Sequence, residues 1–185
     1  MAFDAAMTTR TPQQILFLDV DGVLHPLGKN FLPCYAYLED LVARTDSDLM
    51  YGDDIGYVSP FVHGEFCEPN MSALRYIVQK IPNIKIVLSS TWRETSCQRA
   101  AVLREMKKNG VFPAADQDFC GFTPVLGERH VEILTWLEKF AALNTIWVAL
   151  DDTKLNLSPE NFVQCDSALG LQKIDADKII HLLSV

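Results

Sequence analysis

The chain has 185 residues, of which 49% are hydrophobic, and it carries a formal net charge of −8. This length suffices for a domain with its own core, and we predict one domain over residues 1–185. Because an acidic chain repels nucleic-acid backbones, we expect no large nucleic-acid-binding surface. No stretch approaches the roughly 18–20 apolar residues of a membrane span, and no apolar signal segment opens the chain. We therefore expect a cytoplasmic protein without membrane contact.

Continuous apolar runs predict three buried strands, at residues 15–18, 84–88 and 146–150. A shorter run at 162–163 indicates a fourth. Runs without polar alternation are typical of parallel strands that are covered by helices on both faces.

Apolar residues at helical spacing lie between these strands and predict four helices, over residues 71–80, 94–108, 130–143 and 175–183. Before the second, Thr91 and Glu94 form a capping-box pattern, which predicts Thr91 as the helix cap. Strands that alternate with helices predict an α/β fold, here a three-layer, doubly wound parallel sheet.

Residues 26–70 form a different kind of segment, with four prolines and an acidic patch from Asp46 to Asp54. We interpret it as an insertion after the first strand. It is either a lid, or cap, over the functional site or an irregular surface excursion. As a lid it would carry the substrate selectivity.

Polar side chains follow each of the three clear strands. Doubly wound sheets place their chemistry beyond the carboxyl ends of the strands, so these residues are the candidate site. They are Asp19 and Asp21, Ser89 and Ser90, and Asp151 and Asp152.

The segment Asp19-Val-Asp21-Gly22 carries most of the functional signal. Alternate residues at a strand end project the same way, so the two carboxylates reach one small volume. Their repulsion favours a divalent cation, and a carboxylate can attack phosphorus while a second one transfers a proton. The competing interpretation is an exposed turn without chemistry.

Four motifs in this order resemble those of the haloacid dehalogenase (HAD) superfamily, most of whose members are phosphatases with a Rossmann-like fold. The first is the strand ending in Asp19-Val-Asp21-Gly22, and the second is Ile86-Val-Leu-Ser89. Arg129 matches the third, basic motif, and Val148-Ala-Leu-Asp151-Asp152 matches the fourth. In addition, Ser-Ser-Thr-Trp-Arg93 and Arg129-x-x-Glu132-Ile-x-x-Trp136 are similar to a bacterial subgroup of HAD domains associated with RNA-repair proteins.

The resemblance implies a role for each carboxylate. Asp19 is the nucleophile, and Asp21 acts as general acid and then as base. Mg²⁺ is held by Asp19, the backbone carbonyl of Asp21, and the pair Asp151 and Asp152. Within that pair we favour Asp152 as the direct ligand, with Asp151 binding through water. Oxygen donors without a neighbouring histidine or cysteine suit magnesium rather than zinc.

The resemblance also implies a phosphate-binding set. Ser89 and Ser90 bind phosphoryl oxygens, and Arg129 stabilises the negative charge. Arg93, expected on the surface of the first helical turn, and Lys154 are alternatives to Arg129. His25 is a further candidate for substrate contact, and Asp166 for the second shell of the metal or for loop capping.

These roles describe a magnesium-dependent phosphomonoester hydrolase with an aspartyl-phosphate intermediate on Asp19. Its phosphorylated substrate is a small molecule, a nucleotide, a nucleic-acid end or a phosphoprotein. Two alternatives remain: a catalytically silent metal-binding regulatory or interaction domain of the same fold, and a phosphotransferase. Because the first two aspartates, Ser89 and both later aspartates are all present, the silent domain is less favoured than the hydrolase. Only product analysis separates phosphotransfer from hydrolysis.

Overall fold

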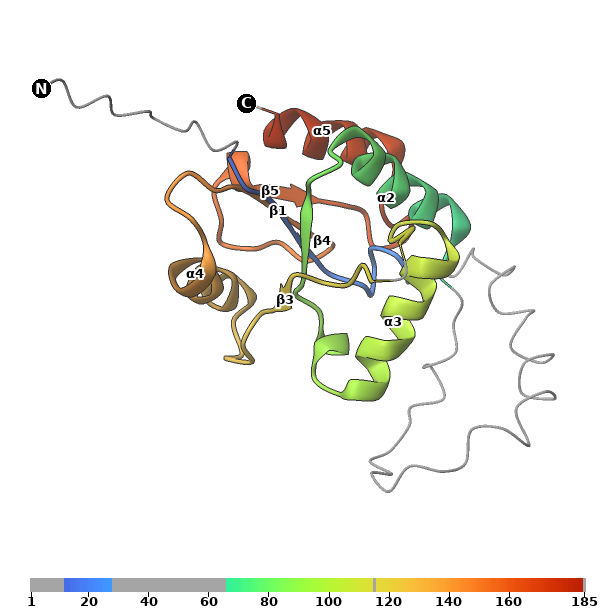
Figure 1. Ribbon diagram of the computed structural model, residues 1–185, viewed down its shortest axis with the longest axis horizontal. Coiled ribbons are helices and arrows are strands. Elements are labelled where there is room, and N and C mark those ends of the chain that lie inside the picture. Colours follow the sequence, from blue (N-terminus) through green and yellow to red (C-terminus); the bar gives the residue numbers. More distant parts are fainter. Residues whose placement is uncertain (1–11, 28–65, 115, 185) are drawn as a thin grey trace, which may run out of the picture.

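The computed structural model describes residues 12–27, 66–114 and 116–184 (Figure 1). Most of the predicted insertion at 26–70, including its acidic patch, lies outside these residues, and its role as a lid stays a prediction. Within the described ranges, no helix has both the length and the apolar character needed to cross a membrane.

Five parallel strands form the sheet, in the order β3-β2-β1-β4-β5. The strands are β1 (Gln14–Leu18), β2 (Lys85–Leu88), β3 (Gly121–Phe122), β4 (Ile146–Asp151) and β5 (Phe162–Gln164). The chain adds β2 and β3 on one side of β1 and then crosses to add β4 and β5 on the other. This doubly wound parallel sheet confirms the predicted α/β fold.

The strand register brings the ends of β1, β2 and β4 to one level, because Leu18 pairs with Leu88 on one side and Leu150 on the other. The ladder continues one step further, as Asp19 N–H donates to the Leu150 carbonyl at 3.0 Å. Ser89 N–H likewise donates to the Leu18 carbonyl at 2.8 Å. The polar residues that follow these strands therefore begin side by side.

Helices cover both faces of the sheet. Helices α2 (Glu68–Lys80), α3 (Ser96–Lys108) and α5 (Lys173–Leu183) lie on one face, and α4 (Arg129–Phe140) lies on the other (Figure 1). Two 3₁₀ turns, η2 (Thr91–Arg93) and η3 (Pro159–Asn161), follow β2 and precede β5.

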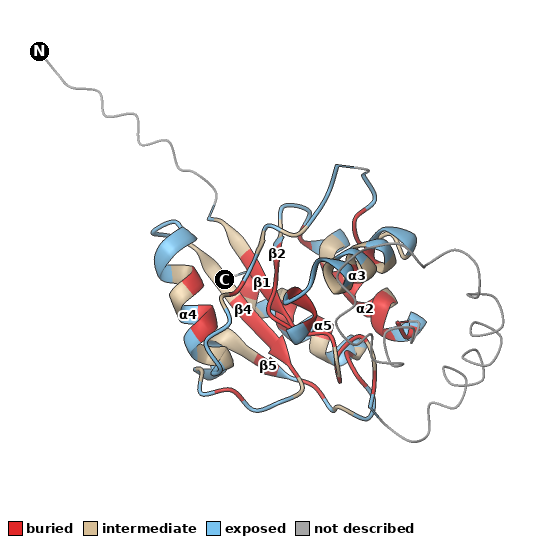
Figure 2. Ribbon diagram, turned by 90° about the horizontal axis from the view of Figure 1, so that it is seen from below, coloured by how far each residue is buried: buried red, intermediate tan, exposed pale blue. Residues whose placement is uncertain are grey.

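Strand β1 supplies both core layers, since its side chains alternate between the faces. Leu16 and Leu18 join the layer beneath α2, α3 and α5, and Ile15 and Phe17 join the layer beneath α4. Phe17 packs edge-on against Trp136 of α4, with ring centroids 5.4 Å apart. Figure 2 shows buried residues concentrated along the central strands.

Each of the four predicted helices has at least one wrong bound; α4 begins at Arg129 rather than 130, and α5 at Lys173 rather than 175. Helix α2 begins at Glu68 rather than 71, because Pro69 occupies its first turn, where a missing N–H costs nothing. Helix α3 begins at Ser96 with Thr95 as its cap, and Thr91 lies in the separate turn η2, whose cap is Ser90. Helix α4 ends at Phe140 rather than 143, since Ala141 is extended and Leu143 is fully exposed.

Candidate active site

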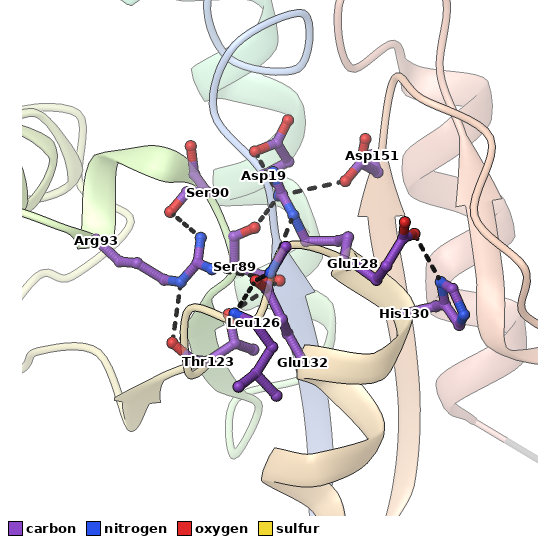
Figure 3. Close-up of polar contacts among 12 residues, drawn as sticks. Asp19, Ser89, Ser90, Arg93, Thr123, Leu126, Glu128, His130, Glu132 and Asp151 are labelled. Atoms are coloured by element: carbon purple, nitrogen blue, oxygen red, sulfur yellow. Dashed lines mark hydrogen bonds and ion pairs between the residues drawn. The ribbon is translucent and has the colours of Figure 1, made fainter.

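Three carboxylates gather at the carboxyl ends of β1 and β4. Asp19, Asp151 and Asp152 each offer an oxygen within 4.8 Å of the others. Asp19 and Asp151 are buried, with 6% and 3% of their surface exposed, and Asp152 is half-buried. The side chains of Asp19 and Asp151 lie close together above the strand ends (Figure 3).

Burial and mutual repulsion make ionisation of this cluster costly. Burial, with a contribution from Asp151, raises the pKa of Asp19 to about 7, against the lowering effect of Arg129. Burial also raises the pKa of Asp151 to about 6, although Arg129 and the Thr153 N–H favour its ionised form. A positive charge near the cluster would lower this cost.

Arg129, the first residue of α4, supplies a positive charge to this cluster. Its Nη1 lies 2.8 Å from Asp19 Oδ1 and 3.4 Å from Asp151 Oδ2. The same nitrogen donates to the Ser89 carbonyl. The structure thus brings the predicted basic residue to the predicted nucleophile, across 110 positions of sequence.

Asp21 lies in the turn that follows β1 and is fixed by Trp92. The indole Nε1 of Trp92 donates to Asp21 Oδ2 at 2.9 Å. The turn itself is closed by a 2.8 Å hydrogen bond from Gly22 N–H to the His25 carbonyl. The sequence carries no local signal for the contact of Trp92 with a residue 71 positions away.

Gly22 allows Asp152 to approach the turn. Its φ of +70° lies in the left-handed region that favours glycine, and a Cβ placed on it would lie 2.3 Å from Asp152 Oδ2. A side chain at position 22 would displace Asp152 from the cluster.

The chain matches the protein family described as "HAD domain in Swiss Army Knife RNA repair proteins" over residues 15–176. The chain belongs to this family. Searches of curated proteins and of solved structures found no match. The match confirms both resemblances, to the HAD superfamily and to its RNA-repair-associated subgroup.

In this HAD domain, the two serines after β2 are buried and face different partners. Ser89 Oγ accepts a 3.4 Å hydrogen bond from Thr123 Oγ1, and its main chain contacts Arg129. Ser90 Oγ accepts from the Trp92 N–H at 3.3 Å, and the Ser90 side chain also lowers the pKa of Asp19. Both serines lie beside Asp19, and their binding of phosphate stays a prediction.

Arg93 was predicted on the surface, and this prediction was wrong. It is 5% exposed, and Glu132 of α4 pairs with it at 2.7 Å. Main-chain carbonyls occupy the rest of its guanidinium, which leaves it committed to protein groups. Lys154, the other alternative, is exposed. Arg129 is therefore the candidate basic residue that contacts Asp19.

The remaining candidates, His25 and Asp166, lie nearby. His25 is half-buried, and its Nδ1 has no hydrogen-bond partner among the described residues. Asp166 is exposed, and its Oδ1 accepts from the Ala168 N–H at 2.9 Å, which is the loop-capping arrangement.

The donor set of the cluster fits a hard divalent cation. All three side chains offer carboxylate oxygen, the ligand type that Mg²⁺ prefers. Two of them are buried carboxylates whose pKa values are raised by burial, so a bound cation would offset the cost of ionising them.

Proposed function

We propose that this HAD domain is a magnesium-dependent phosphomonoester hydrolase that works through an aspartyl phosphate on Asp19. The observation that carries this proposal is the position of Asp19. Its carboxylate lies at a strand end, within the three-aspartate cluster and 2.8 Å from the Arg129 guanidinium. A nucleophile, a cation-binding cluster and a fixed positive charge are the elements that phosphoryl transfer requires.

In the first half-reaction, an Asp19 carboxylate oxygen attacks phosphorus and the bond from phosphorus to the ester oxygen breaks. Asp21, protonated, gives its proton to the departing oxygen, which leaves as an alcohol. Arg129 and the main-chain N–H groups after β2 stabilise the charge on the phosphoryl oxygens.

In the second half-reaction, Asp21 accepts a proton from water as the water oxygen attacks phosphorus. The bond from phosphorus to Asp19 breaks, which releases inorganic phosphate and restores the Asp19 carboxylate. Trp92, through its hydrogen bond to Asp21 Oδ2, holds the carboxylate that handles both protons.

Asp19, Asp151, Asp152 and the Asp21 carbonyl would hold Mg²⁺. Bound there, the cation reduces the repulsion between an anionic nucleophile and an anionic substrate. Arg129 brings one positive charge to a site with three carboxylates, so the guanidinium by itself does not balance their negative charge.

The test is hydrolysis of an aryl phosphate with Mg²⁺ and then with excess chelator, with Asp19→Asn as the near-isosteric control. We expect turnover that requires Mg²⁺ and that falls by about three orders of magnitude or more in the variant. Acid-quenched wild-type protein should also carry one phosphoryl group on the peptide that contains Asp19. Magnesium binding without turnover on any phosphate ester would favour the silent regulatory domain instead.

The family description favours a phosphorylated RNA end among the four substrate classes. The net charge of −8 argues that such a substrate contacts the domain through its terminal nucleotides rather than along its length. RNA oligonucleotides with a 3′- or a 5′-terminal phosphate should therefore be compared with nucleoside monophosphates. A higher kcat/KM for the oligonucleotides would support this choice.

Transfer to an acceptor other than water shares the first half-reaction. Product analysis with an alcohol present separates the two, because a phosphotransferase forms the new ester faster than it releases phosphate.

A further inference from the structure

Arg93 and Glu132 form a buried ion pair beside the site. Arg93 Nη2 lies 2.7 Å from Glu132 Oε2, and the two side chains are each 4% exposed. Arg93 comes from η2, which follows β2, and Glu132 comes from the first turn of α4. The pair therefore joins two elements that carry predicted phosphate-site residues.

All three guanidinium nitrogens of Arg93 donate hydrogen bonds. Nη1 donates to the Ser90 carbonyl at 2.6 Å, and Nε donates to the Thr123 carbonyl at 2.9 Å (Figure 3). Nη2 donates to the Pro124 carbonyl at 3.0 Å. Arg93 thus ties the loop after β2 to the loop after β3.

Glu132 completes the link to α4. Its Oε1 accepts the N–H groups of Leu126 and Gly127, at 2.8 and 3.1 Å. Its Oε2 accepts from Arg93 and lies 3.9 Å from Arg129 Nε, one helical turn away. One carboxylate therefore contacts the loop before α4, Arg93 and Arg129.

A buried ion pair adds little net stability, because removing two charges from water offsets most of their attraction. Its distinct effect is geometric, since it fixes the elements that its hydrogen bonds join. Here those elements carry Ser90 and Arg129, and Arg129 contacts Asp19.

We propose that the Arg93–Glu132 pair is a positioning device that holds Arg129 and the Ser89–Ser90 main chain in register with Asp19. Glu132 Oε2 attracts Arg129 Nε across 3.9 Å, an ion-pair distance, while Arg129 Nη1 donates to Asp19. This assignment rests on the proposed hydrolase function for its kinetic consequence but not for its structural one.

The test variant is Glu132→Gln, which keeps the shape of the side chain and removes its charge. We expect kcat for an aryl phosphate to fall about 10- to 100-fold, while KM changes by less than about threefold. Arg93→Lys keeps the charge but loses hydrogen bonds to the loop carbonyls, and we expect a comparable loss. It also serves if Glu132→Gln fails to fold.

Two measurements separate positioning from general destabilisation. Ile179→Ala, in the α5 core, is the control that lowers Tm without changing kcat. In ¹⁵N NMR spectra, the Arg129 Nε–H signal, assigned with Arg129→Lys, should broaden or shift in Glu132→Gln but not in Ile179→Ala.

An unchanged Arg129 signal together with an unchanged kcat would overturn the proposal. A wild-type domain that lacks turnover but shows the expected NMR change would instead contradict the hydrolase function and leave the positioning role supported.

Discussion

The indole Nε1 of Trp92 donates a 2.9 Å hydrogen bond to Oδ2 of Asp21, the proposed general acid and base. Trp92 is 7% exposed and packs against Phe66, with ring centroids 5.7 Å apart. A rigid, buried donor fixes the orientation of a carboxylate that must meet first a leaving group and then water.

Trp92→Phe keeps an aromatic ring against Phe66 and removes the donor. We expect kcat to fall about tenfold, since proton transfer contributes about 10²–10⁴-fold to such reactions and only its geometry is weakened. The loss should be larger for alkyl phosphates than for an aryl phosphate, because a poor leaving group depends more on the acid. Trp147→Phe, on the far layer of the core, is the control. Equal losses for both substrate types would contradict the link to Asp21.

The stability of the metal-free domain should fall as pH rises. Burial raises the pKa of Asp19 to about 7, above the ordinary value of about 3.9. Below the ordinary value both states are protonated, and the stabilising contribution is fully present. Between about pH 4 and pH 7 the folded state binds more protons than the unfolded chain, so this contribution is lost as pH rises. Thermal unfolding of wild type and Asp19→Asn with chelator measures it, and the variant should show the weaker pH dependence.

Magnesium reverses this trend. Because the cation binds the ionised carboxylates, we expect Mg²⁺ to raise Tm more at about pH 8 than at about pH 5, with proton release on binding. Calorimetric titrations in two buffers of different ionisation enthalpy count those protons. A Mg²⁺ affinity independent of pH would contradict the assignment of buried Asp19 and Asp151 to the site.

Gly22→Ala should impair Mg²⁺ binding more than it impairs folding. The new Cβ would lie 2.3 Å from Asp152 Oδ2, so Asp152 must move. Gly110→Ala is a matched control, because its φ is +67° and its new Cβ would meet only Arg75 Cδ, at 3.6 Å. We expect both variants to lose about 1–2 kcal/mol of stability from the left-handed backbone. Only Gly22→Ala should lose the Mg²⁺-dependent rise in Tm and more than about tenfold in activity.

The rate at which the Cys165 thiol is modified measures how closed the Asp21–His25 turn is. Its Sγ donates to the Gly22 carbonyl at 3.5 Å, and burial raises its pKa to about 12. We expect aromatic disulfide reagents to modify the exposed Cys97 and Cys120 quickly and Cys165 slowly, at a rate that Mg²⁺ lowers further. Mass spectrometry of the labelled peptides locates each reaction. Modification of Cys165 as fast as Cys97 would contradict a closed turn.

The strands and the aspartates of the cluster could be predicted from the sequence because their signals are local. An apolar run that ends in Asp19 or Asp151 predicts both the strand and the edge where its polar residue lies. Strand β3 was missed because it has only two residues, Gly121 and Phe122, and gains its place from pairing with β2.

Long-range pairing accounts for the wrong placement of Arg93. Arg93 has the local pattern of an exposed residue at a helix start. Glu132, 39 positions later, and main-chain carbonyls, among them two from the loop after β3, make its burial tolerable. The hydrogen bond from the Trp92 indole to Asp21 is also a long-range contact, between residues 71 positions apart. No property of residues 90–95 by themselves specifies these partners.

The position of β1 at the centre of the sheet has a consequence for synthesis on the ribosome. Asp19 is made early, but its neighbours in the cluster follow more than a hundred residues later, after β2, β3 and α4. Until β4 pairs with β1, one edge of β1 is open and only Asp19 of the three carboxylates is in place. The proposed cation site therefore forms late in folding. A cation bound there would stabilise the completed sheet and none of its separate parts.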